Sequence, residues 1–75
     1  MDLSRIPKNI KVKIVAINAQ AALKKRLASL GIGIGKEVEV LETTLQKNTI
    51  KIAIGLGSIA LRLDEAKCIE VEACA

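Results

Sequence analysis

A chain of 75 residues has room for one small domain, and 25 of its side chains are Ile, Leu or Val, which is enough for an aliphatic core. The absence of Phe, Tyr, Trp and His excludes the aromatic grooves, cages and stacking platforms that bind proline-rich peptides, methylated lysine and single-stranded nucleic acid. The net charge of +4 divides into +6 over residues 1–37 and −2 over residues 38–75, so the chain is only a mild electrostatic dipole.

The cysteine content and the first residues indicate a compartment. Two cysteines, Cys68 and Cys74, are too few for the disulfide framework of a small secreted domain. Residues 1–6 include charges and lack the apolar run of a signal peptide, and no uncharged stretch approaches the ~18 residues of a membrane span. We therefore expect a reduced, cytoplasmic protein that does not cross a membrane by itself.

Alternation of aliphatic and polar side chains with a period of two predicts five short strands. In the first strand, Ile10, Val12 and Ile14 alternate with lysines, which places the aliphatic side chains on one face. The same pattern predicts strands at residues 37–42, 50–54, 59–63 and 68–72.

Between the first two strands the period changes to that of a helix. Leu23, Leu27 and Leu30 follow one another at intervals of four and three, so they share one helical face, and the Ala-rich start favours a helix. The pattern predicts a helix over residues 19–30, with Gly31 as its C-terminal cap.

The other connections are short. Residues 46–49 and 55–58 suit hairpin turns, and residues 64–67 predict one helical turn capped by Asp64. Five short strands that each bury one face do not suit a flat open sheet. We therefore expect a mainly β fold, a small partly open barrel of about five strands with one inserted helix, in a single domain spanning residues 1–75.

Two glycine clusters match phosphate-binding loops poorly. Residues 31–36 end in Gly-Lys, but Leu30 and Glu37 stand where a P-loop needs Gly and then Ser or Thr. Residues 55–60 match G-x-G-x-x-A, but too few residues follow them for the helix and the acidic residue of a dinucleotide-binding fold. The first cluster is interpreted as the loop that follows the helix, and the second as a hairpin turn.

Residues suited to catalysis or metal binding are sparse. Without His there is no Ser/His/Asp or Cys/His set, so we expect no enzyme activity. Cys68, Cys74, Glu70 and Glu72 fall short of a closed zinc site. We expect no cofactor and no resident metal, and direct Fe(II) sensing by these residues is kept as an alternative.

Basic side chains offer a second alternative, a small-barrel protein that contacts nucleic-acid phosphates without sequence preference. The residues concerned are Lys8, Lys11, Lys13, Lys24, Lys25 and Arg26. A solvated surface is the favoured interpretation, so we expect no nucleic acid as a partner.

Aliphatic residues in loops are harder to explain by folding alone. Ile32 and Ile34 lie between glycines, and Leu56 lies at the tip of a glycine-flanked hairpin. If they cluster with Leu45, they form an apolar docking patch; otherwise the loops fold back and cover the ends of the barrel. Docking is favoured for Leu56, and the two interpretations are balanced for Ile32 and Ile34.

Blocks of this sequence resemble the FeoA family of ferrous iron transport proteins. The most specific block is Arg26-Leu27-x-x-Leu30-Gly31-x-x-x-Gly35, which Ala60-Leu61-Arg62 follows, and the resemblance covers residues 3–72. It implies an SH3-like barrel and a small cytosolic accessory protein of FeoB, the membrane transporter of ferrous iron.

The resemblance implies a regulator of ferrous iron uptake that acts by protein contact with a FeoB-type transporter on its cytoplasmic side. Unpaired edges of a partly open barrel also allow a homo-oligomer. In this interpretation the helix leucines pack onto the barrel, the glycines shape the adjoining loop, and the basic residues and Leu56 face the partner. The predicted partner-binding residues are Lys25, Arg26, Leu27, Leu30, Gly31, Ile34, Gly35 and Leu56.

Overall fold

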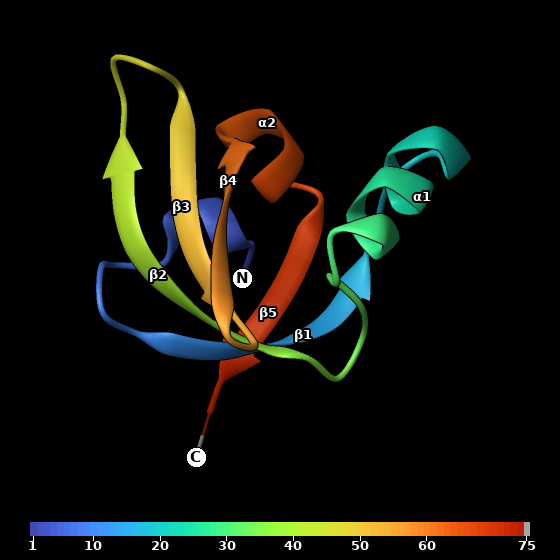
Figure 1. Ribbon diagram of the computed structural model, residues 1–75, viewed down its shortest axis with the longest axis horizontal. Helices are drawn as coiled ribbons and strands as arrows, with labels where there is room; N and C mark the ends of the chain where they lie inside the picture. Colours follow the sequence, from blue (N-terminus) through green and yellow to red (C-terminus); the bar gives the residue numbers. More distant parts are fainter. Residues whose placement is uncertain (75) are drawn as a thin grey trace.

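The computed structural model describes residues 1–74 and shows a mainly β fold (Figure 1). Five antiparallel strands are joined by two α-helices, one 3-10 helix and short turns. The strands are β1 (Lys11–Ile17), β2 (Glu37–Thr44), β3 (Thr49–Ile54), β4 (Gly57–Arg62) and β5 (Ile69–Ala73). The helices are η1 (Leu3–Arg5), α1 (Ala21–Ser29) and α2 (Leu63–Ala66).

All five strands belong to one sheet with the order β4-β3-β2-β1-β5. The register shifts between Ile14 and Ala16 in β1 and between Val40 and Glu42 in β2, and such irregularities bend a strand. The bent sheet curls into a partly open SH3-like barrel, and α2 packs against η1, β3 and β4 (Figure 1). The expected five-stranded barrel with an inserted helix is confirmed.

The core of the barrel is aliphatic because the strands turn alternate residues inward. In β3, Ile50 and Ile52 are fully buried while Lys51 between them is exposed. No polar or charged residue is buried among residues 1–74, so the burial of apolar surface drives packing here. The largest fully buried side chains are Leu3, Ile14, Leu27, Ile32, Ile50, Ile52, Leu61 and Ile69.

Helix α1 ends in a motif that orders the following loop. Gly31 has a φ of 88°, and its amide donates to the Ala28 carbonyl at 3.0 Å. The Ile32 amide donates to the Leu27 carbonyl at 3.0 Å. These two bonds make a Schellman motif, in which the residue after the glycine packs back onto the helix. Ile32 is accordingly buried, so its part of the loop covers the barrel and takes no part in a docking patch.

The boundaries of α1 differ from the expected range of 19–30. The helix begins at Ala21, after Gln20, which makes no side-chain capping bond, and it ends at Ser29. None of the helices that the structure describes is long and apolar enough to cross a membrane.

The expected cap of the second helical segment is wrong. Helix α2 begins one residue earlier than expected, at Leu63, and Arg62 stands at the cap position in place of Asp64. The backbone amide of Arg62 donates to Oε1 of Glu65 at 3.0 Å, which satisfies a donor at the start of the helix. The residue in the sequence that indicates the start of α2 is therefore Glu65, three residues after the cap position.

Candidate functional site

A groove of about 480 Å³ opens between the loop that follows α1 and the turn that joins β3 to β4. The two segments meet because β2 starts beside the end of β3, where Val38 pairs with Ile54. Both lie at the same end of the barrel in Figure 1. The groove is lined by Leu30, Gly31, Gly35, Lys36, Glu37, Ile54 and Gly55.

Backbone hydrogen bonds fix the loop wall of this groove against β1. The Gly35 amide donates to the Ile14 carbonyl at 2.8 Å, and the Ile14 amide donates to the Lys36 carbonyl at 2.9 Å. Gly35 has a φ of 91°, a left-handed conformation that glycine adopts without steric cost. The predicted role of Gly35 in shaping this loop agrees with its conformation.

The opposite wall is a two-residue hairpin turn. Ile54 pairs with Gly57, which leaves Gly55 and Leu56 as the turn. Of these two residues, Gly55 has a positive φ of 58°, as the first position of a type II′ turn requires. So tight a turn holds the Leu56 side chain away from the barrel.

Two exposed aliphatic side chains flank the groove. Leu56 is fully exposed, and Ile34 is 71% exposed. Each adjoins a glycine that lines the groove, Gly55 and Gly35 respectively. Removal of apolar surface from water is favourable by about 25 cal/mol per Å². Binding of a partner that covers these side chains would therefore be stabilised by their burial. The two side chains are therefore apolar surface that this chain leaves uncovered beside the groove.

Leu45 and Ile32 do not belong to this surface. Leu45 is 80% exposed, but it lies in the turn between β2 and β3. Successive hairpin turns lie at opposite ends of the strand they share, so Leu45 and Leu56 are separated by the length of β3 (Figure 1). Of the four loop residues expected to cluster, Ile34 and Leu56 are the two that are exposed and adjoin the groove.

The predicted residues of α1 have different surroundings. Lys25 is exposed, and no ion pair within residues 1–74 involves it. The Arg26 guanidinium forms an ion pair with Glu65 of α2. Leu27 is fully buried, so it packs the helix onto the barrel and cannot touch a partner, whereas Leu30 is partly exposed at the groove.

Four residues that line the groove were absent from the prediction: Lys36, Glu37, Ile54 and Gly55, the last of which directly precedes the predicted Leu56. Lys36 and Glu37 directly follow the predicted loop, so extending that loop to the first residue of the next strand would have found them. Ile54 lies there because of its pairing with Val38, and local sequence patterns do not specify which strands pair.

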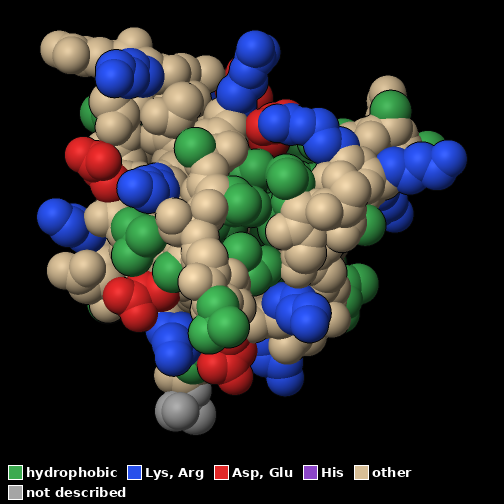
Figure 2. Space-filling view, in the orientation of Figure 1, with side chains coloured by type: hydrophobic (Ala, Val, Ile, Leu, Met, Phe, Trp, Pro, Cys, Tyr) green, Lys and Arg blue, Asp and Glu red, His purple; other side chains and the backbone are tan. Residues whose placement is uncertain are grey.

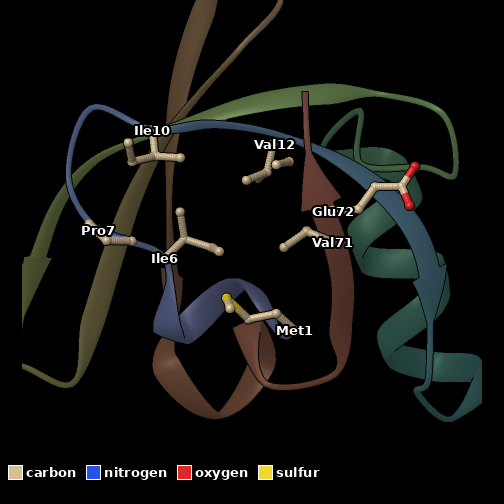
Figure 3. Close-up of a pocket in the computed structure, with 8 residues that line it drawn as sticks. Met1, Ile6, Pro7, Ile10, Val12, Val71 and Glu72 are labelled. Atoms are coloured by element: carbon tan, nitrogen blue, oxygen red, sulfur yellow. The ribbon is translucent and has the colours of Figure 1, made fainter. Parts of the chain in front are cut away.

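A second cleft, of about 350 Å³, lies among the N-terminal segment, β1 and β5 (Figure 3). In this view Ile6, Val12 and Val71 point toward one another, whereas the Glu72 carboxylate points away. None of the predicted partner-binding residues lines it. The lining residues are Met1, Ile6, Pro7, Ile10, Val12, Val71, Glu72 and Ala73.

The residues considered for Fe(II) sensing do not converge on a site. Cys68 and Cys74 are both free thiols, and Sγ of Cys68 lies 3.7 Å from the carbonyl oxygen of Asp64. Across residues 1–74, no three cysteine or carboxylate side chains lie close enough together to hold a metal ion.

Two of the lysines considered for nucleic-acid binding, Lys11 and Lys13, have acidic neighbours in the sheet. Lys11 pairs with Glu39 of β2, while Lys13 pairs with Glu37 of β2 and with Glu72 of β5. Opposite charges on adjacent strands reduce the positive potential that phosphates would meet.

Comparison with known proteins identifies relatives of nearly the whole chain. A family model described as FeoA domain matches residues 1–73. Fe(2+) transport protein A of Campylobacter jejuni is 37% identical over 71 residues, which cover 95% of this chain and 96% of that protein. The protein of the same name from Helicobacter pylori is 36% identical over 73 residues, which cover 96% of this chain and 94% of that protein.

A solved structure shares the fold as well. The solution structure of iron(II) transport protein A from Clostridium thermocellum is similar with a TM-score of 0.91 and 32% sequence identity. The similarity covers 97% of this chain and 45% of that one, so this chain spans less than half of the solved chain. The family match over residues 1–73, together with the two relatives of similar length, shows that this chain belongs to the FeoA family.

Proposed function

We propose that this protein is a non-enzymatic accessory protein of ferrous iron uptake that binds a FeoB-type membrane transporter on its cytoplasmic side. The observation that carries the proposal is the full exposure of Leu56 in a two-residue turn beside the groove. Membership of the FeoA family and the names of the relatives support a role in Fe(2+) transport. The proposal also places residues 1–75 in the cytoplasm as one domain.

The groove and its rim favour contact with a protein over chemistry on a small molecule. Leu56 and Ile34 supply two aliphatic anchors, and the burial of one such side chain is worth about 1.5–3 kcal/mol. Lys25 and Lys36 are exposed on the adjoining helix and loop, where they suit the polar rim that surrounds an apolar centre in protein interfaces. Regulation in this proposal consists of binding and release.

The test is a binding measurement with two leucine variants. The full chain is titrated against the cognate FeoB-type transporter in lipid nanodiscs, with and without guanine nucleotide. We expect Leu56→Asp to weaken binding at least tenfold, because the change places a charge at the centre of the contact. Leu45→Asp is the matched control, since Leu45 is also exposed in a hairpin turn but lies at the other end of β3.

The two variants separate a specific contact from a general effect of charge. Both side chains are exposed, so both variants should retain the denaturation midpoint of the parent chain. Equal weakening by the two changes would show that Leu56 is not the anchor. Failure of the parent chain to bind the transporter at all would contradict the proposed function.

A further inference from the structure

The two edges of the sheet differ in how they are closed. β5 is covered by the N-terminal segment, because the Val71 amide donates to the Met1 carbonyl at 2.8 Å and Asp2 bridges to Glu70. β4 is the other edge and pairs with β3 alone. An unpaired strand edge is a template for the addition of another strand.

The register of the β3–β4 hairpin identifies the free backbone groups of β4. In a two-residue hairpin the residues that flank the turn exchange both hydrogen bonds, and every second pair then repeats the pattern. The hydrogen-bonded pairs are Ile54 with Gly57, Ile52 with Ile59, and Ile50 with Leu61. The bond from the Leu63 amide to the Asn48 carbonyl, at 2.9 Å, continues this series.

The intervening residues of β4 therefore direct their backbone groups outward. The Arg62 amide is one of them, and it is satisfied by Glu65. The remaining two are Ser58 and Ala60, whose amides and carbonyls have no partner among the hydrogen bonds of residues 1–74. Four backbone groups of β4 are thus available for an added strand.

An apolar hollow adjoins this edge. Figure 2 shows hydrophobic side chains gathered between the backbone of β4 and helix α1. Ile59 of β4 is partly buried on the inward face, and Leu23 of α1 and Leu30, which caps the end of that helix, are partly buried against the same core. Leu30 also lines the groove described above. A strand added to β4 would place alternate side chains against these aliphatic residues.

The charge beside the hollow indicates what kind of strand would fit. Helix α1 has Lys24 and Lys25 and no acidic residue, and Arg62 is exposed at the end of β4. None of these three cations forms an ion pair within residues 1–74. A segment that fits this surface is extended and has aliphatic side chains at every second position. It also has acidic side chains beside them, which face these cations.

We propose that the edge of β4 binds such an extended, acidic and aliphatic segment of the transporter as a sixth strand. This inference rests on the proposed function, and it extends the contact from Leu56 along Ser58 and Ala60. A second copy of this chain is a poorer fit, because the β4 edge of that copy would have its own α1 beside it and would present Arg62 and lysines in place of acidic side chains.

The experiment removes one outward amide. Ala60→Pro deletes a donor that β3 does not use, and proline is tolerated at an edge position of this kind. Ala60→Val is the matched control, because it changes the same exposed side chain and keeps the amide. With the cognate transporter in nanodiscs, we expect at least tenfold weaker binding by Ala60→Pro and less than twofold change by Ala60→Val. Amide exchange at Ser58 and Ala60 should slow at least tenfold in the complex.

Each other outcome overturns the proposal in a recognisable way. If Leu56→Asp weakens binding while Ala60→Pro binds like the parent chain and exchange at Ser58 is unchanged, strand addition is wrong and the proposed function stands. If the amides are protected without transporter in a concentration-dependent manner, a second copy occupies the edge. If the parent chain does not bind the transporter, both proposals fall. Equal denaturation midpoints for both Ala60 variants confirm that the barrel is intact.

Discussion

Arg26 of α1 and Glu65 of α2 form an ion pair between segments that are 39 residues apart in sequence. The Glu65 side chain is 15% exposed, and its other carboxylate oxygen accepts the hydrogen bond of the Arg62 amide at 3.0 Å. One carboxylate therefore caps α2 and holds α1 beside it. Because Leu27 is the only residue of α1 that is buried, this polar link contributes to the position of the helix.

Glu65→Ala should destabilise the protein more than Arg26→Ala. The first change loses both a capping interaction, worth about 0.5–2 kcal/mol, and the ion pair. The second loses only the pair, and since the Arg26 side chain is 52% exposed, about 0–1 kcal/mol is expected. Urea denaturation followed by far-UV circular dichroism measures both, because the chain has no aromatic fluorophore. Equal losses would show that the capping bond contributes nothing.

Gly31→Ala should lower the free energy of unfolding by about 1–2 kcal/mol, the cost of a left-handed backbone for a residue with a Cβ atom. No atom lies within 4 Å of the position where that Cβ would be, so the cost is conformational and not steric. Gly33→Ala is the control, since it has equal space and no positive φ. We expect that variant to match or exceed the parent in thermal stability, by up to about 1 kcal/mol. Equal losses in both variants would argue against the Schellman motif.

Leu27→Ala should cost about 2–5 kcal/mol, because it leaves a cavity beneath α1. A domain of this length is stable by only about 4–11 kcal/mol, so helix α1 is expected to loosen from the barrel. Leu30→Ala, at a partly exposed site, should cost less than half as much. Amide hydrogen exchange in α1 would detect the loosening, and unchanged exchange in Leu27→Ala would mean that the helix is held by other contacts.

The strands could be predicted from the sequence because each has one buried face. The alternation of Ile50 and Ile52 with Lys51 translates directly into the burial pattern of β3. The end of α1 was also predictable, since a glycine after the last leucine indicates a left-handed cap. The start of α2 was missed because Asp64 is a common capping residue, whereas here the side chain of Glu65 satisfies the amide.

The candidate site was less predictable because it depends on strand pairing. Leu45 and Leu56 have the same local pattern, an exposed leucine in a hairpin turn, and only the order of strands places one beside the groove and the other far from it. Similarly, Ile32 and Ile34 both lie between glycines, but the Schellman bond buries the first and leaves the second exposed. Aliphatic residues in loops could be found in the sequence, but strand pairing and the helix cap determine which of them are exposed beside the groove.

The charge pattern across β1 leads to a last prediction about Lys13. This residue faces Glu37 on one neighbouring strand and Glu72 on the other. Lys13→Glu would place three carboxylates in a row, and like charges on adjacent strands should destabilise the sheet by about 0.5–2 kcal/mol in total. Because the repulsion is electrostatic and exposed, raising the salt concentration from 0.05 M to 1 M should recover most of the loss in urea midpoint.

Lys47→Glu is the control for this effect. It produces the same change in net charge, but Lys47 is exposed in the turn between β2 and β3, outside any strand. Its cost should stay below about 0.5 kcal/mol, as for ordinary surface substitutions, and should depend little on salt. A loss in Lys13→Glu that persists at 1 M salt would mean that the lysine stem contributes by packing. In that case the row of alternating charges across β5, β1 and β2 would have no measurable part in holding the open barrel together.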